Sequence, residues 1–125
     1  MNKEQIQIKE FMIKAGQDCP DKPTLPNDTV KALRVSLIQE EFNELKQGLY
    51  TNDLVEVYDA LLDIMVVTIG TAVALGLVLQ PGWQEVHRSN MSKFIDGHRR
   101  EDGKWIKGPS YSPANLKPII EEQMK

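Results

Sequence analysis

Hydrophobic positions in the first half of the chain recur at helical spacing on both sides of a proline-rich loop. Apolar residues lie three or four positions apart over 3–15, which predicts a short helix. Residues 17–27 contain three prolines and predict a loop. A second helix is expected over 28–47, and Gly48 suits the cap at its C-terminal end. The first half of the chain therefore predicts two helices and no strand.

The second half of the chain continues the helical pattern with shorter connections. A third helix is expected over 53–77, followed by a turn over 79–82 and a fourth helix over 83–94. The polar stretch after it contains Asp102-Gly103, a tight-turn signal, and forms either a small hairpin or an ordered loop. Ser112 can cap and Pro113 can open a last short helix over 113–124. Short connections predict antiparallel neighbouring helices, and the pattern as a whole predicts an all-α protein.

The stretch 64–84 carries no charged residue and approaches the length of a transmembrane span. Pro81 and Gly82 interrupt it, no Lys/Arg pair anchors it, and acidic residues lie just upstream on the same helix. We therefore interpret it as a helix buried on nearly all sides in a bundle, with no membrane partner. Because the chain offers few helices to cover such a surface, we expect an oligomer in which a second subunit buries the remainder.

Composition narrows the classes of function that the chain can have. Its 125 residues fit one domain over 1–125 with an ordinary packed core. The net charge of −3 is too small to argue for electrostatic steering, and no basic run supports a nucleic-acid partner. Cys19 is the only cysteine, so no internal disulfide is possible, which fits a reducing, cytoplasmic compartment.

Two short acidic clusters fall inside the second and third helices. They occupy the runs QEEFNEL and VEVYDALLD and comprise Glu40, Glu41, Glu44, Glu56 and Asp59. Residues three or four apart share a helix face, and both clusters continue apolar stripes, so we expect the carboxylates to point towards the core. Ionised carboxylates repel one another and are costly to bury alone. A hard cation such as Mg2+ resolves both problems because it takes oxygen ligands.

The order and spacing of these residues resemble a known family. EEFNE followed by EVYD, with eleven residues between Glu44 and Glu56, resembles the EExxE…ExxD motif of the all-α NTP pyrophosphohydrolases, which include MazG-like, dimeric dUTPase-like and phosphoribosyl-ATP pyrophosphohydrolase-like proteins. SNMSKF at 89–94, followed by DGKWIKGPSYSP, is similar to the C-terminal half of the phosphoribosyl-ATP pyrophosphohydrolase-like and MazG-like branch. The similarity covers most of the chain from the second helix to the start of the expected last helix.

The resemblance implies a fold, an activity and a cofactor. The fold is all-α with a four-helix-bundle core, assembled as a homodimer or homotetramer. The activity is hydrolysis of the α–β phosphoanhydride bond of a nucleoside triphosphate, which gives a monophosphate and pyrophosphate. The cofactor is Mg2+, for which Mn2+ is a possible substitute, and its implied ligands are Glu41, Glu44, Glu56 and Asp59.

The resemblance leaves the substrate open, because members of the superfamily cleave dUTP, dCTP, phosphoribosyl-ATP or mixed nucleotides. The first alternative is a phosphoribosyl-ATP pyrophosphohydrolase of histidine biosynthesis. The second is a noncatalytic helical module that binds metal or nucleotide, or that only dimerises. The complete set of acidic residues weighs against this second alternative.

Several residues receive a catalytic or substrate-binding role from the same reasoning. Glu40 is either a further ligand or, with Glu41 beside it, the base that orients the attacking water. Asp63 lies one turn beyond Asp59 and either supports the metal ligands or caps a polar network in the core. A flexible ammonium suits the phosphate chain, so we assign Lys93 to it and Asn90, on the same helical face, to the sugar or a phosphate. The following loop carries a basic patch formed by Arg99, Arg100, Lys104 and Lys107. The patch either closes over the phosphates or is a solvated surface. Of its members, Lys104 and Lys107 are assigned to the substrate.

Overall fold

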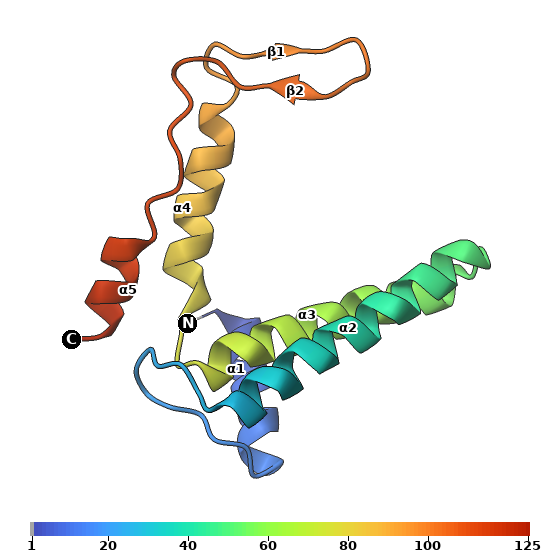
Figure 1. The fold of residues 1–125 in the computed structure, drawn as a ribbon, viewed down its shortest axis with the longest axis vertical. Coiled ribbons are helices and arrows are strands. Elements are labelled where there is room, and N and C mark those ends of the chain that lie inside the picture. The colour runs from blue at the N-terminus through green and yellow to red at the C-terminus, as the bar shows by residue number, and fades with distance from the viewer. Residues whose placement is uncertain (1) are drawn as a thin grey trace. The chain divides into compact units, whose positions relative to one another are not determined.

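The computed structural model describes residues 2–125 and consists of helices with one small hairpin (Figure 1). The elements in chain order are α1 (Lys3–Lys14), α2 (Asp28–Tyr50), α3 (Leu54–Ala74), α4 (Leu79–Ser92), β1 (His98–Arg99), β2 (Trp105–Ile106) and α5 (Lys117–Gln123). The expected all-α class is confirmed. The chain forms two compact units, an N-terminal unit that ends at Val78 and a C-terminal unit that begins at Leu79.

In the N-terminal unit, α2 and α3 run side by side in opposite directions, and α1 packs against α3 (Figure 1). A short turn that includes Asn52, whose φ is +55°, joins α2 to α3 and makes them antiparallel neighbours. Met12 of α1 is buried with Val73 and Ala74 of α3, and these residues form the small apolar core of the unit. Within the N-terminal unit, α1 therefore contacts the C-terminal part of α3, where the apolar core lies.

Side chains cap the starts of α2 and α3, and a glycine lies inside α2. The Asn27 side chain accepts a hydrogen bond from the Val30 amide at 3.0 Å, and the Asp53 side chain accepts one from the Glu56 amide at 3.1 Å. The expected end of α2 at Gly48 is wrong, because the helix continues to Tyr50 and Gly48 is buried within it. A Cβ at this position would lie 3.1 Å from the Val57 side chain, so the glycine permits the close approach of α3 rather than ending a helix.

The third helix is shorter and more exposed than its apolar sequence predicts. It ends at Ala74 rather than 77, because Gly76 follows with φ +68° and turns the chain. The expectation of burial on nearly all sides is wrong for the single chain: Leu54, Val55 and Tyr58 are 80%, 79% and 66% exposed. By length and composition α3 would also pass as a membrane span, a test that core helices of soluble proteins pass as well.

The C-terminal unit begins with a helix where the sequence predicted a turn. The turn expected over 79–82 is the first turn of α4, which tolerates Pro81 because the amides of a first helical turn have no partner within the helix. The helix ends at Ser92 rather than at Phe94. Of the two alternatives left open for the following segment, the hairpin forms: β1 and β2 pair antiparallel, with Arg99 opposite Trp105.

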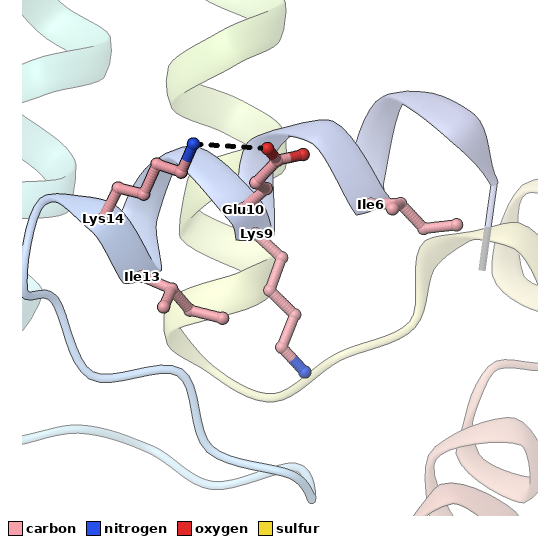
Figure 2. Close-up of a pocket in the computed structure, with 5 residues that line it drawn as sticks. All are labelled: Ile6, Lys9, Glu10, Ile13 and Lys14. Atoms are coloured by element: carbon pink, nitrogen blue, oxygen red, sulfur yellow. Dashed lines mark ion pairs between the residues drawn. The ribbon is translucent and has the colours of Figure 1, made fainter.

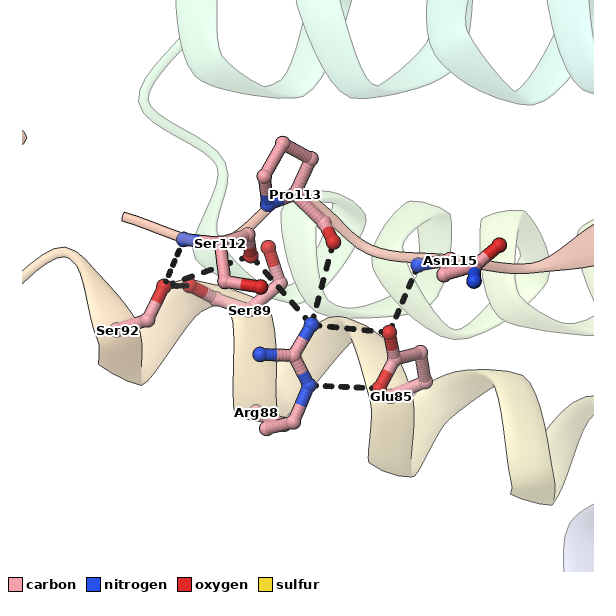
Figure 3. A network of polar contacts seen from close by, with 7 residues as sticks. All are labelled: Glu85, Arg88, Ser89, Ser92, Ser112, Pro113 and Asn115. Carbon is pink, nitrogen blue, oxygen red and sulfur yellow. Dashed lines mark hydrogen bonds and ion pairs between the residues drawn. The ribbon is translucent and has the colours of Figure 1, made fainter. Parts of the chain in front are cut away.

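The last helix begins at Lys117, so the start expected at 113 is wrong. The preceding segment is held against α4 by a polar network (Figure 3). Glu85 and Arg88 form an ion pair at 2.7 Å, Arg88 donates a hydrogen bond to the Pro113 carbonyl at 3.2 Å, and the Asn115 amide donates one to Glu85 at 2.7 Å. The Pro113 carbonyl, which would accept a hydrogen bond inside a helix that began at 113, is therefore bound to Arg88 of α4.

Two serines of the SNMSKF run belong to the same network. Ser89 and Ser92 are buried, and the Ser92 hydroxyl donates a hydrogen bond to the Ser89 carbonyl at 2.6 Å. The same hydroxyl accepts a hydrogen bond from the Ser112 amide at 2.9 Å (Figure 3). Ser112 was expected to cap the last helix, but its amide is used to attach the C-terminal segment to α4.

Candidate metal centre

Three carboxylates meet where α2 and α3 pack together. Glu41 and Glu44 lie three residues apart on α2, and Asp63 faces them from α3. One carboxylate oxygen from each residue lies within 4.8 Å of the others. We call this group the carboxylate cluster. It forms because antiparallel packing brings the middle of α2 opposite the middle of α3.

The three carboxylates of the cluster lie close together although their negative charges repel one another. Glu41 Oε2 is buried and has no hydrogen-bond partner among residues 2–125. Burial, and next the Glu44 side chain, raise the pKa of Glu41 to about 7, with further contributions from Asp63 and Asp59. Burial, and next the charge of Asp59, also raise the pKa of Asp63. Neighbouring carboxylates therefore make ionisation of Glu41 and of Asp63 less favourable.

The donor set of the cluster fits a hard divalent cation. All three side chains offer oxygen, which Mg2+, Mn2+ and Ca2+ prefer, and none offers the nitrogen or sulfur typical of zinc or copper sites. A buried oxygen without a hydrogen-bond donor is costly unless a cation or a proton meets it. Glu41 Oε2 is such an atom, so a metal ion bound here would satisfy it and neutralise the repulsion among the three carboxylates.

The expected metal ligands do not all lie in the cluster. Glu41 and Glu44 lie in it, and Asp59 is near enough to influence the pKa of both Glu41 and Asp63. Glu56 lies outside the group, where α3 passes close to Gly48 of α2. The cluster instead contains Asp63, for which the sequence left two roles open. The signal that could have identified Asp63 is its position seven residues after Glu56, on the same face of α3.

Glu40 and Asn90, the remaining helical candidates, are exposed. Glu40 lies beside Glu41 in the sequence but outside the cluster, so the expectation that it points towards the core is wrong: adjacent residues of a helix face different directions. Asn90 lies on α4 between the buried serines and faces solvent. Exposure keeps both side chains accessible for the roles predicted from the sequence.

Two of the candidate lysines converge within the C-terminal unit. The ammonium groups of Lys93 and Lys107 lie 5.9 Å and 4.2 Å from the centre of the Tyr111 ring. The backbone of Lys93 is fixed because the Trp105 indole donates a hydrogen bond to its carbonyl at 2.6 Å. The sequence reasoning missed Tyr111, although it lies in the GPSY run of the second matching block.

The other members of the basic patch do not join these two lysines. Arg100 forms an ion pair with Asp102, and Lys104 is exposed in the turn of the hairpin. Arg99 is also exposed, on β1. The structure therefore divides the patch into a pair of lysines around one aromatic ring and a set of residues on the hairpin.

A separate shallow hollow lies on the exposed face of α1, lined by Ile6, Lys9, Glu10, Ile13 and Lys14 (Figure 2). Its one ion pair joins Lys14 to Glu10 at 3.6 Å, and both side chains are well exposed. All five residues come from a single helix, and none belongs to the carboxylate cluster. We assign no function to it, because an exposed pair one turn apart is ordinary on a helix surface.

Comparison with known families agrees with the fold and with the position of the carboxylates. The family model described as phosphoribosyl-ATP pyrophosphohydrolase matches residues 8–90, from α1 through most of α4, and both acidic clusters lie within the match. No curated protein matches the chain. The resemblance seen in the sequence is thereby confirmed. The chain belongs to the phosphoribosyl-ATP pyrophosphohydrolase family, a branch of the all-α NTP pyrophosphohydrolases and a family of hydrolases that act on phosphoanhydride bonds.

Proposed function

We propose that this protein uses Mg2+ to hydrolyse the α–β phosphoanhydride bond of a nucleoside triphosphate, releasing a monophosphate and pyrophosphate. One observation carries the proposal: a cluster of three carboxylates with a buried, unpartnered oxygen, in a chain of a pyrophosphohydrolase family. A triphosphate and a group of carboxylates repel each other, so they can meet only with cations between them. The carboxylate cluster and the triphosphate therefore both require a divalent cation.

The residues that would hold the ion are Glu41, Glu44 and Asp63, with Asp59 contributing further negative charge. When bound, Mg2+ supplies Lewis acidity towards phosphoryl oxygens. Mn2+ shares its preference for oxygen ligands and is the expected substitute. The chain itself contributes the position of the carboxylates, because two packed helices hold them in place before substrate arrives.

The other proposed roles belong to side chains with accessible polar groups. Glu40 is exposed and is proposed either as a further ligand or as the base that orients the attacking water. Lys93 and Lys107 converge on Tyr111, and we propose that their charges neutralise the phosphate chain. Asn90 is proposed to donate a hydrogen bond to the sugar or to a phosphate. Lys104, in the hairpin turn, is a further candidate for phosphate contact.

Phosphoribosyl-ATP is the second candidate substrate, and the description of the matching family favours it at least as much as a simple triphosphate. Both compounds contain the α–β phosphoanhydride bond, so the carboxylate cluster does not discriminate between them. Discrimination must come from residues that contact the base and the sugar. The match to a family of hydrolases weighs against the noncatalytic module.

A panel of substrates tests the proposal directly. Phosphate release is measured from the four ribonucleoside and four deoxyribonucleoside triphosphates and from phosphoribosyl-ATP, with Mg2+ and with or without added inorganic pyrophosphatase. We expect release that depends on the added pyrophosphatase, because the first product is pyrophosphate. Glu44→Gln serves as the blank, since it removes a charged ligand but keeps the size of the side chain. Release without pyrophosphatase would indicate cleavage of the terminal phosphate and would contradict the proposed bond, as would no release from any compound.

A further inference from the structure

Arg34 of α2 is a buried cation that contacts neutral groups of α3. Only 6% of the residue is exposed, and burial lowers the pKa of its guanidinium. Its Nε donates a hydrogen bond to Thr71 Oγ1 at 3.2 Å, and its Nη2 donates one to the Val67 carbonyl at 3.0 Å. Among residues 2–125 no carboxylate lies within ion-pair distance of it. Burial of an arginine without an anion is a poor way to stabilise a core, and an apolar side chain would serve as well or better.

Gly70 of α3 provides the space that the guanidinium occupies. A Cβ at this position would lie 2.5 Å from Arg34 Nη2 and 3.4 Å from the sulfur of Met12 on α1. The guanidinium therefore lies in space that the missing side chain of Gly70 leaves open, and a larger residue there would displace it. With the two directional hydrogen bonds, this makes the Arg34 contact specific for one alignment of the two helices.

The Arg34 contact lies in line with the carboxylates. Three contacts between α2 and α3 follow one another at steps of about two helical turns: Gly48 with Val57, Glu41 with Asp63, and Arg34 with Gly70. The carboxylate cluster is the middle contact. A close-fitting contact lies on each side of it, and of these two only the one at Arg34 contains hydrogen bonds from a side chain to the partner helix.

The apolar part of the α2–α3 contact does not by itself specify this alignment. From Ile64 to Ala74 the α3 sequence carries no charged residue, and apolar contacts are non-directional, so they discriminate poorly between alignments. A slip of one turn would move Glu41 by about 5.4 Å along α3. That exceeds the 4.8 Å within which the carboxylate oxygens gather, so Glu41 and Glu44 would no longer lie opposite Asp63. Buried polar contacts are known to select helix register at some cost in stability.

We propose that Arg34 is a positioning residue that sets the register of α2 against α3 and so holds Glu41 and Glu44 opposite Asp63. The inference rests on the proposed function, since it concerns the ability of the cluster to bind a divalent cation. It adds a residue that touches neither the metal nor the substrate. It also separates two properties that usually change together, because loss of Arg34 should impair metal binding without lowering stability.

Two variants test the proposal by different routes, with Mn2+ affinity measured by calorimetry and thermal stability measured in EDTA. Arg34→Met removes the hydrogen bonds but keeps an apolar stem, and Gly70→Ala keeps the arginine but fills its slot. We expect each to weaken Mn2+ binding about 10- to 100-fold, the range typical of residues that orient metal ligands. We also expect the melting temperature of Arg34→Met to stay at or above that of the wild type. Arg34→Lys, which keeps a charged donor, should bind Mn2+ with intermediate affinity.

A matched control distinguishes positioning from general destabilisation. Gln5→Leu removes a buried hydrogen bond of 2.6 Å from α1 to the carbonyl of Leu77, a residue outside α2. It should lower the melting temperature and leave the Mn2+ affinity of the folded protein unchanged. In a Glu41→Gln background, Arg34→Met should cause little further loss of affinity, because both changes act on the same ligand.

The outcomes separate this inference from the proposed function. If the wild type does not bind Mn2+, or if Glu41→Gln binds it equally well, the metal centre itself is refuted and the role of Arg34 with it. If the wild type binds and Arg34→Met and Gly70→Ala bind equally well, only the positioning role is overturned. The positioning role is also overturned if Gln5→Leu loses as much affinity as these two variants do. Should Arg34→Met fail to fold, Gly70→Ala and Arg34→Lys decide the question by the same measurement.

Discussion

Glu41 on α2 and Asp63 on α3 bring carboxylate oxygens within 4.8 Å of each other across two antiparallel helices. Neither residue is paired with a cation among residues 2–125, although both carry a raised pKa. Two like charges held this close raise the free energy of the folded protein whenever both are ionised. The arrangement is therefore sensitive to pH and to divalent cations.

The metal-free protein should become less stable as the pH rises from about 4.5 to about 7. Glu41 has a pKa of about 7 in the folded protein, against an ordinary value of 4.5, so in this window the folded state binds more protons than the unfolded chain. The free energy of unfolding therefore falls with rising pH. Protonation of Glu41 makes its full stabilising contribution only below about pH 4.5. Thermal unfolding in EDTA, followed at several pH values, measures this dependence.

Glu41→Gln should flatten that pH dependence and stabilise the metal-free protein at neutral pH. Glu40→Gln is the matched control, because the two residues are adjacent but Glu40 is exposed and outside the cluster. An equal change in both variants would show that the effect comes from net charge rather than from the cluster.

Mg2+ should raise the melting temperature at neutral pH. A ligand that binds only the folded state stabilises it by mass action, by about 2.7 kcal/mol at about 100 times the dissociation constant. The gain should shrink towards pH 5, because protons compete for Glu41, and it should be largely lost in Glu44→Gln. Calorimetric scans with Mg2+ or with Na+ at equal ionic strength measure the difference, and equal melting temperatures would contradict a metal site.

The sequence was informative about helices and faces, and less so about contacts between helices. Helical spacing correctly placed Glu41 and Glu44 on one face, because that depends only on the pitch of α2. The role of Gly48 was misjudged because a glycine near a helix end serves equally well as a cap or as a point of close approach. The assignment of Asp63 to the cluster required the register of α2 against α3. That register is set by tertiary contacts such as the one at Arg34.

The start of the last helix was misjudged for a similar reason. Ser112 followed by Pro113 has the composition of a helix start. In the structure Glu85, Arg88 and Ser92 bind the backbone of this segment instead. Nothing local in the sequence reveals these partners, because they lie some 20 to 30 residues away along the chain.

Lys93→Ala should lower kcat/KM by about 10- to 100-fold while leaving Mg2+ binding in the free enzyme intact. The loss corresponds to a charge-assisted hydrogen bond of about 1.5–3 kcal/mol to a phosphate, and an ammonium cannot ligate a metal. Lys117→Ala, which removes an exposed lysine from α5, is the control. Steady-state kinetics and Mg2+ calorimetry on both variants measure the effect. Full activity of Lys93→Ala would show that Lys93 does not contact the phosphates and would leave Lys104, Lys107 or the neighbouring arginines as the candidates.

Acid should detach the segment before α5 from α4. Hydrogen bonding from Arg88, and next from the Asn115 amide, lowers the pKa of Glu85 to about 2 from 4.5. The attachment of the segment to α4 is therefore at full strength above about pH 4.5 and is lost as the pH falls towards 2. The reason is that Glu85 is protonated at a higher pH when the segment is detached than when it is attached. Glu85→Gln should reproduce the effect at neutral pH. Hydrogen exchange at the Asn115 amide reports it, and unchanged protection in Glu85→Gln would show that the segment is held by other contacts.

The protein should be an oligomer at micromolar concentration, because the apolar surface of α3 is too exposed for a stable isolated chain. Val55 and Tyr58 are 79% and 66% exposed in a helix whose composition is that of a core element. A second copy that covers this surface would form an interface resembling a core cut in half. Val55→Lys places a charge in that interface and should shift the protein towards monomer, whereas Lys9→Ala on α1 should not. Sedimentation equilibrium distinguishes dimer, tetramer and monomer, and a stable, folded wild-type monomer would refute the expectation.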